Sequence, residues 1–187
     1  MGFFDGFKFG SNKSISVIIT NTQNNIFNIY GCKNPSDSQK MKASVYLCIA
    51  GIALLNELSI NSNNDAMKIM INKIVNETRE LTKPLSMKVS DLANDKEDLQ
   101  LILSGFEIQL DTDTIVNGLG AFEALYLSKV ERLINDILTH NCGPFGCAGY
   151  AAYVVANGIF GADKAHDNFI QVGNEIQLFR SKLVDLF

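Results

Sequence analysis

The sequence predicts an all-α fold: a compact single-domain bundle of five to six helices. Apolar residues recur every three or four positions along most of the chain, which is the period of an amphipathic helix. Residues 43–56 carry no charge, as expected for a helix that is buried on every side. With 187 residues and only three prolines, the chain fits one domain without a linker. We interpret residues 1–12 as a Phe-rich N-terminal arm and residues 13–187 as the helical domain.

The first element, residues 14–30, fits both a helix and a strand. Ile15, Val17 and Ile19 alternate as they would in a strand, but apolar residues continue at helical spacing as far as Tyr30. The length of this pattern favours a helix.

The second helix is predicted at residues 36–58, at the centre of the bundle. Asn34 or Ser36 can cap its start, and Pro35 suits its first turn, where no backbone N–H is needed. Apolar side chains cover all of its faces, so other helices are expected to surround it.

The third helix is predicted at residues 64–82. Asn63 or Asn64 is the expected cap, and Pro84 is expected to end the helix. Its buried stripe is predicted to consist of Met67, Met70, Ile71, Ile74 and Val75.

The remaining chain contains a less regular region and then three helices. Residues 95–104 fit a short helix, and residues 106–110 alternate in the manner of one short extended segment. The three helices that follow are predicted at residues 113–139, 145–160 and 164–186. In the second of them, Ala148, Ala152 and Ala156 would let a neighbouring backbone approach closely. The last helix should bury Phe169, Val172, Ile176, Phe179 and Leu183.

Composition excludes some classes of function. The net charge is −4 and no stretch of the sequence is a basic cluster, which disfavours nucleic-acid binding. The N-terminus has no charged region followed by a long apolar run, so we expect no secretory signal, a cytoplasmic location and reduced thiols. Residues 141–162 are uncharged, but five glycines and a proline disfavour a membrane span there.

The strongest chemical candidate is the group His140, Cys142, Cys147 and His166. One imidazole and two thiols within eight residues could ligate zinc, and His166 or a distant cysteine could complete the set. Alternatively, Cys147 near a helix start could be a nucleophile paired with a histidine. Two further interpretations assign these residues no binding or catalytic role. They are a helix–helix turn with half-buried thiols, or a disulfide between the two cysteines. The Cys-x4-Cys spacing is unlike a tight zinc knuckle, so no metal, catalytic residue or cofactor is assigned.

Three functions therefore stay open. The first is a non-catalytic binding or assembly module, homo-oligomeric in form, with a protein partner or a second copy of itself. The second is a ligand- or metal-binding protein or enzyme with its site near His140, Cys142, Cys147 and His166. The third is a peripheral membrane protein. The same four residues of the N-terminal arm would contact the membrane or, alternatively, a protein partner: Phe3, Phe4, Phe7 and Phe9.

Overall fold

The computed structural model describes residues 12–91, 119–140 and 146–186 and confirms the all-α prediction, since these ranges contain helices and no strand. Seven helices lie in the described ranges, rather than the five to six that were predicted. They are α1 (Asn12–Ile29), α2 (Asp37–Asn61), α3 (Asp65–Asp91), α6 (Leu119–Thr139), α7 (Cys147–Phe160), α8 (Ala162–Ala165) and α9 (Phe169–Val184).

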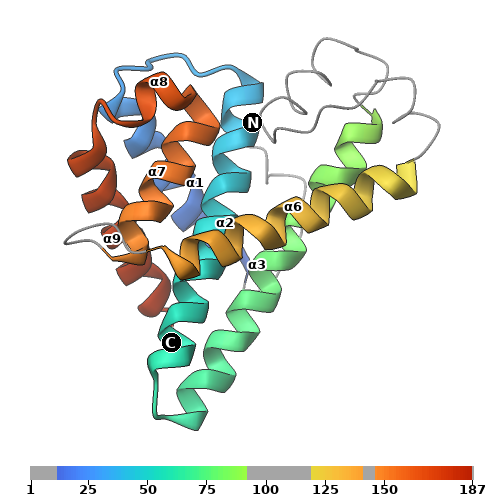
Figure 1. The fold of residues 1–187 in the computed structure, drawn as a ribbon, viewed down its shortest axis with the longest axis vertical. Coiled ribbons are helices and arrows are strands. Elements are labelled where there is room, and N and C mark those ends of the chain that lie inside the picture. Colours follow the sequence, from blue (N-terminus) through green and yellow to red (C-terminus); the bar gives the residue numbers. More distant parts are fainter. Residues whose placement is uncertain (1–11, 92–118, 141–145, 187) are drawn as a thin grey trace.

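Helix α2 is the centre of the bundle, as predicted (Figure 1). It packs most extensively against α3, which returns beside it after a tight turn, and against α7, and it also contacts α6, α1 and α9. Helix α6 crosses in front of α2, and α1 and α9 pack against each other on the side away from α3. This arrangement covers α2 all round.

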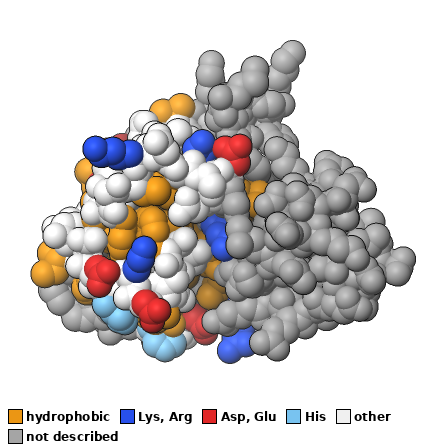
Figure 2. All heavy atoms as spheres, turned by 90° about the horizontal axis from the view of Figure 1, so that it is seen from above, with side chains coloured by type: hydrophobic (Ala, Val, Ile, Leu, Met, Phe, Trp, Pro, Cys, Tyr) orange, Lys and Arg blue, Asp and Glu red, His pale blue; other side chains and the backbone are white. Residues whose placement is uncertain are grey.

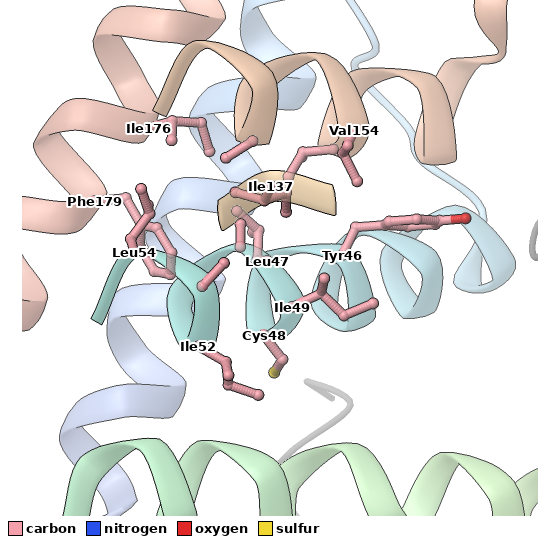
Figure 3. Packing of buried hydrophobic residues seen from close by; sticks show 14 of the residues in the cluster. Tyr46, Leu47, Cys48, Ile49, Ile52, Leu54, Ile137, Val154, Ile176 and Phe179 are labelled. Atoms are coloured by element: carbon pink, nitrogen blue, oxygen red, sulfur yellow. The ribbon is translucent and has the colours of Figure 1, made fainter. Parts of the chain in front are cut away.

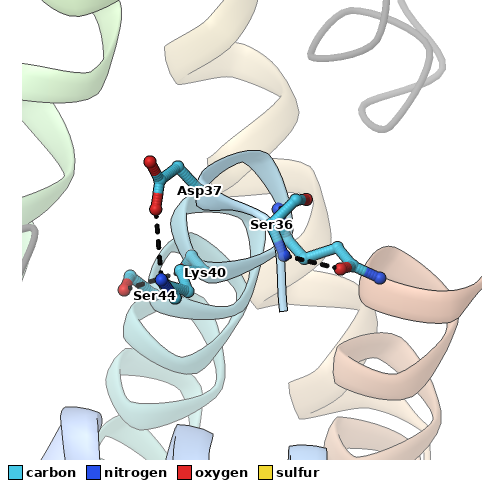
Figure 4. Close-up of polar contacts among 5 residues, drawn as sticks. Ser36, Asp37, Lys40 and Ser44 are labelled. Atoms are coloured by element: carbon cyan, nitrogen blue, oxygen red, sulfur yellow. Dashed lines mark hydrogen bonds and ion pairs between the residues drawn. The ribbon is translucent and has the colours of Figure 1, made fainter. Parts of the chain in front are cut away.

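The start of α2 is fixed by a capping box at Ser36 (Figure 4). The Ser36 hydroxyl accepts a hydrogen bond from the Gln39 backbone N–H at 3.2 Å, and the Ser36 N–H donates to the Gln39 side chain at 2.9 Å. One turn of the helix is further tied by the Lys40–Asp37 ion pair at 3.1 Å. Of the two predicted caps, Ser36 is therefore correct, and Pro35 precedes the cap instead of lying in the first turn.

The core is built around the uncharged part of α2 (Figure 3). Residues 43–55 are all buried. Leu47 meets Ile137 of α6 and Val154 of α7, and Phe179 of α9 lies against the same helix near Leu54. By length and composition the segment Gln39–Asn61 could also cross a membrane, but 72% of its most apolar window is buried by the rest of the bundle. Packing within the protein thus accounts for the apolar character of α2.

Helix α1 spans Asn12–Ile29, which confirms the helical reading of residues 14–30. Ile15, Ile19, Ile26 and Phe27 are fully buried, whereas Val17 is exposed. The alternation near the start of this segment is therefore incidental, and the longer helical period determines the structure.

The predicted end of the third helix at Pro84 is wrong, because α3 continues to Asp91. A proline inside a helix removes one hydrogen bond and costs about 3 kcal/mol in isolation. Helix α3 as a whole packs against α2 and α6. Asn64 does cap the helix, accepting from the Met67 N–H at 3.2 Å, but Met70 of the predicted stripe is exposed.

The last predicted helix is divided into α8 and α9. The break falls at residues 166–168, where Asn168 leaves helical geometry (φ −127°, ψ 33°) and precedes the first residue of α9. The Asn168 side chain makes no capping hydrogen bond to α9, so the break is a feature of the backbone at this residue. Four of the five predicted core residues of this region are buried, and Phe169 is half-buried.

Several predictions lie outside the described residues. These are the arm with Phe3, Phe4, Phe7 and Phe9, the helix at 95–104, the extended segment at 106–110, the start of the helix at 113–139, and Cys142. The roles proposed for the arm in partner and membrane contact stay predictions.

Candidate ligand-binding pocket

The two histidines of the predicted site both lie beside tyrosines of α7. The His140 ring stacks on Tyr150 with centroids 4.4 Å apart and 16° between the planes, and its Nδ1 is 2.7 Å from the Asp136 carbonyl oxygen. The His166 ring is tilted against Tyr153 at 5.1 Å. Figure 2 shows histidine side chains, coloured pale blue, at the edge of the described surface. The structure thus brings them to one side of α7, through the tyrosines.

Cys147 lies in a different environment, at the start of α7. Its thiol donates a weak hydrogen bond to the Leu138 carbonyl oxygen at 3.8 Å and is close to Glu57 and Arg180. Burial raises the pKa of the Cys147 thiol, and the Glu57 carboxylate raises it further, while Arg180 acts in the opposite direction. A raised pKa keeps the thiol protonated at neutral pH, which is unfavourable for the predicted nucleophile.

The zinc hypothesis gains no support in the described part of the chain. No group of three or more His, Cys, Asp or Glu side chains converges there, and Cys32, Cys48 and Cys147 are free thiols. Cys142 lies outside the described residues, so its predicted pairing with Cys147 or with a metal stays a prediction.

A pocket of about 620 Å³ lies on the side of α7 that carries these tyrosines, between α2, α6 and α7. The described residues that line it are Lys42 and Tyr46 from α2; Lys129, Arg132, Leu133 and Asp136 from α6; and Tyr150, Tyr153, Val154, Asn157, Gly158, Ile159, Phe160 and Gly161 from α7 and its end. The volume falls within the range of about 300–1,000 Å³ that is usual for small-molecule sites.

The described residues that line the pocket include the cations Lys42, Lys129 and Arg132 and the carboxylate of Asp136. Lys42 is half-buried, and this burial lowers the pKa of its ammonium group, because a charge removed from water is disfavoured. Among the described lining residues, cations therefore outnumber carboxylates, in a chain whose net charge is −4.

The walls of the pocket are held by close packing between α2 and α7. Gly158 lies directly under the Tyr46 ring, so closely that a side chain at this position would overlap the ring. Phe160 stacks on Tyr30 of α1 with centroids 4.0 Å apart, and the Tyr30 hydroxyl donates to the Lys164 carbonyl oxygen at 3.2 Å. These contacts fix the pocket walls within the folded core.

Sequence reasoning placed a site near the histidines but missed the pocket cations. Lys42 is far in the sequence from Lys129 and Arg132, which lie three residues apart, and no local pattern connects it with them. A sign was present in Lys42, which directly precedes the long uncharged part of α2 and therefore lies where the helix enters the core.

No protein-family model matches this chain, and no curated protein or solved structure matches it either.

Proposed function

We propose that this protein is a non-catalytic binding module that takes a small organic anion in the pocket between α2, α6 and α7. The observation that carries the proposal is that the described lining residues bring three cations, from two helices, together with one carboxylate. Opposite charge on the ligand would offset the repulsion among these cations and the partial loss of hydration at Lys42.

The size of the pocket supports a small molecule over a macromolecular polyanion. A volume of about 620 Å³ suits a ligand of metabolite size. Binding to a nucleic acid would instead require cations spread along an extended surface, whereas Lys42, Lys129 and Arg132 line one hollow.

We propose a non-catalytic function because of the protonation state expected for the candidate nucleophile, the Cys147 thiol. The raised pKa of Cys147 and its neighbours Glu57 and Arg180 favour a packed thiol over a thiolate. His140 stacks on Tyr150 and His166 is tilted against Tyr153, an arrangement that suits support of the pocket wall.

Calorimetric titration of the full chain with citrate and with inorganic phosphate tests this proposal. We expect saturable binding of at least one anion, weakened about tenfold by Lys42→Met or Arg132→Met, since each removes one charge at close range. Lys68→Met is the matched control, because Lys68 lies on α3 in an exposed pair with Asp65 and should leave binding unchanged.

Two results would contradict the proposal. One is that neither anion binds at millimolar concentration. The other is that both pocket variants bind as tightly as the unmodified chain while their circular dichroism is unchanged.

A second candidate function is self-association at the α2–α3 turn. Ile60 at the end of α2 is 74% exposed and Ile69 near the start of α3 is 71% exposed, and Met70 beside it is also exposed. Large aliphatic side chains near one turn favour a contact with a second copy or another protein. Light scattering at tens of micromolar should then give a dimer that Ile69→Asp converts to a monomer; a monomer in both cases removes this candidate.

A further inference from the structure

Two tyrosines of α7 line the pocket as neighbours on one face of the helix. Tyr150 and Tyr153 are three residues apart, and their ring centroids are 6.0 Å apart with 35° between the planes. Both side chains are half-buried, so part of each ring is accessible to a molecule in the pocket.

Each tyrosine ring is also packed against an imidazole. His140 stacks on Tyr150 at 4.4 Å, and His166 is tilted against Tyr153 at 5.1 Å. The four rings form one row along α7, anchored at one end by the 2.7 Å contact between His140 Nδ1 and the Asp136 carbonyl oxygen. Rings that are already held in place lose little conformational entropy when a ligand stacks on them.

Charge and aromatic surface lie on different walls of the pocket. The cations Lys42, Lys129 and Arg132 come from α2 and α6, whereas Tyr150 and Tyr153 come from α7. A ligand that contacts both walls needs an anionic group at one end and a flat apolar group at the other.

We infer that the ligand is an aromatic anion, in which a flat ring lies against Tyr150 and Tyr153 and a phosphate or carboxylate group meets the cations of α2 and α6. This inference rests on the proposed function and adds the chemical class of the ligand. Stacking between aromatic rings adds to the favourable burial of the ring surface. Together these contributions correspond to an affinity at least roughly tenfold above that of the bare anion.

Matched pairs of probes separate the ring from the charge. Phenyl phosphate is compared with inorganic phosphate, and benzoate with acetate, by calorimetric titration of the full chain. We expect the aromatic member of at least one pair to bind at least tenfold more tightly than its partner. The pair that responds tells whether the anionic group is a phosphate or a carboxylate.

Variants of Tyr153 assign the effect to the ring. Tyr153→Leu should remove the preference for the aromatic probe, so that the two members of a pair bind with similar affinity. Tyr153→Phe should retain the preference, because it keeps the ring and loses only the hydroxyl. Circular dichroism checks that each variant is folded, and the comparison of probes on the unmodified chain does not depend on any variant.

The outcomes distinguish the two proposals. If both members of each pair bind equally, the aromatic inference is wrong and the anion proposal stands. If no probe binds, the proposed function fails as well. A preference that survives Tyr153→Leu and also Tyr150→Leu overturns the assignment to these rings.

Discussion

Replacement of Gly158 by alanine is the sharpest test of the packing that shapes the pocket. A Cβ atom at this position would overlap the Tyr46 ring, far inside the separation of roughly 3.5 Å at which carbon atoms normally pack. Tyr46 is itself buried, with only 4% of its surface exposed. The ring can therefore make room only by displacing its own neighbours in the core.

The magnitude follows from two opposed effects. Overpacking a core costs about 1–3 kcal/mol, whereas alanine is up to about 1 kcal/mol better than glycine inside a helix. We expect Gly158→Ala to lower the free energy of unfolding by about 1–2 kcal/mol. Gly51→Ala is the matched control, because its nearest contact would be Phe179 Cζ at 3.3 Å, which needs a shift of only a few tenths of an ångström. Its effect should stay within about 1 kcal/mol of zero.

Urea denaturation followed by circular dichroism measures both variants, and a second background tests the cause. In a Tyr46→Ala chain the ring is absent, so Gly158→Ala should be neutral or stabilising by up to about 1 kcal/mol. The reasoning is refuted if Gly158→Ala is as well tolerated as Gly51→Ala, or if it is equally harmful with and without the Tyr46 ring.

Three further predictions concern stability. Ser36→Ala should destabilise the chain by about 1 kcal/mol in urea, because it removes the cap of α2; an unchanged midpoint would count against the capping box. Arg180→Met should lower the free energy of unfolding by about 1–2 kcal/mol, because it removes the ion pair at 3.0 Å with Glu57, a side chain that is about a quarter exposed. Glu57→Gln in the same background should recover part of that loss. Burial raises the pKa of Cys48 from 9.0 to about 12, so its thiol keeps its proton in the folded chain and loses it in the unfolded chain between these values. The free energy of unfolding should then fall with rising pH by up to about 1.4 kcal/mol per unit above pH 9. The Cys48→Ala chain should show a shallower slope, and an equal slope in both chains would contradict this reasoning.

The fold class was predictable because the signals for the central helix agree. Ser36 and Gln39 have the spacing of a capping box, and the chain then runs uncharged from Ala43 through Leu55. The prediction was wrong where the local chemistry of a residue disagreed with the helix that the structure shows. Pro84 is a helix breaker by local chemistry, yet α3 continues through it to Asp91.

The candidate site was predictable only in part, for a physical reason. His140 and His166 stand out in a chain with two histidines, and the structure does place both beside α7. The positive charge of the pocket was hidden because Lys42 and Arg132 are ninety residues apart and converge only when α6 crosses α2. A charged residue that the sequence pattern predicts to be solvent-exposed becomes part of a pocket only through tertiary packing.

The central claim is that the pocket between α2, α6 and α7 binds an aromatic anion. Amide chemical-shift mapping of the ¹⁵N-labelled chain during a phenyl phosphate titration tests it most directly. We predict saturable shifts that cluster around Lys42, Arg132 and Tyr153. Shifts confined to the α2–α3 turn, or no saturable shift at all, would contradict it.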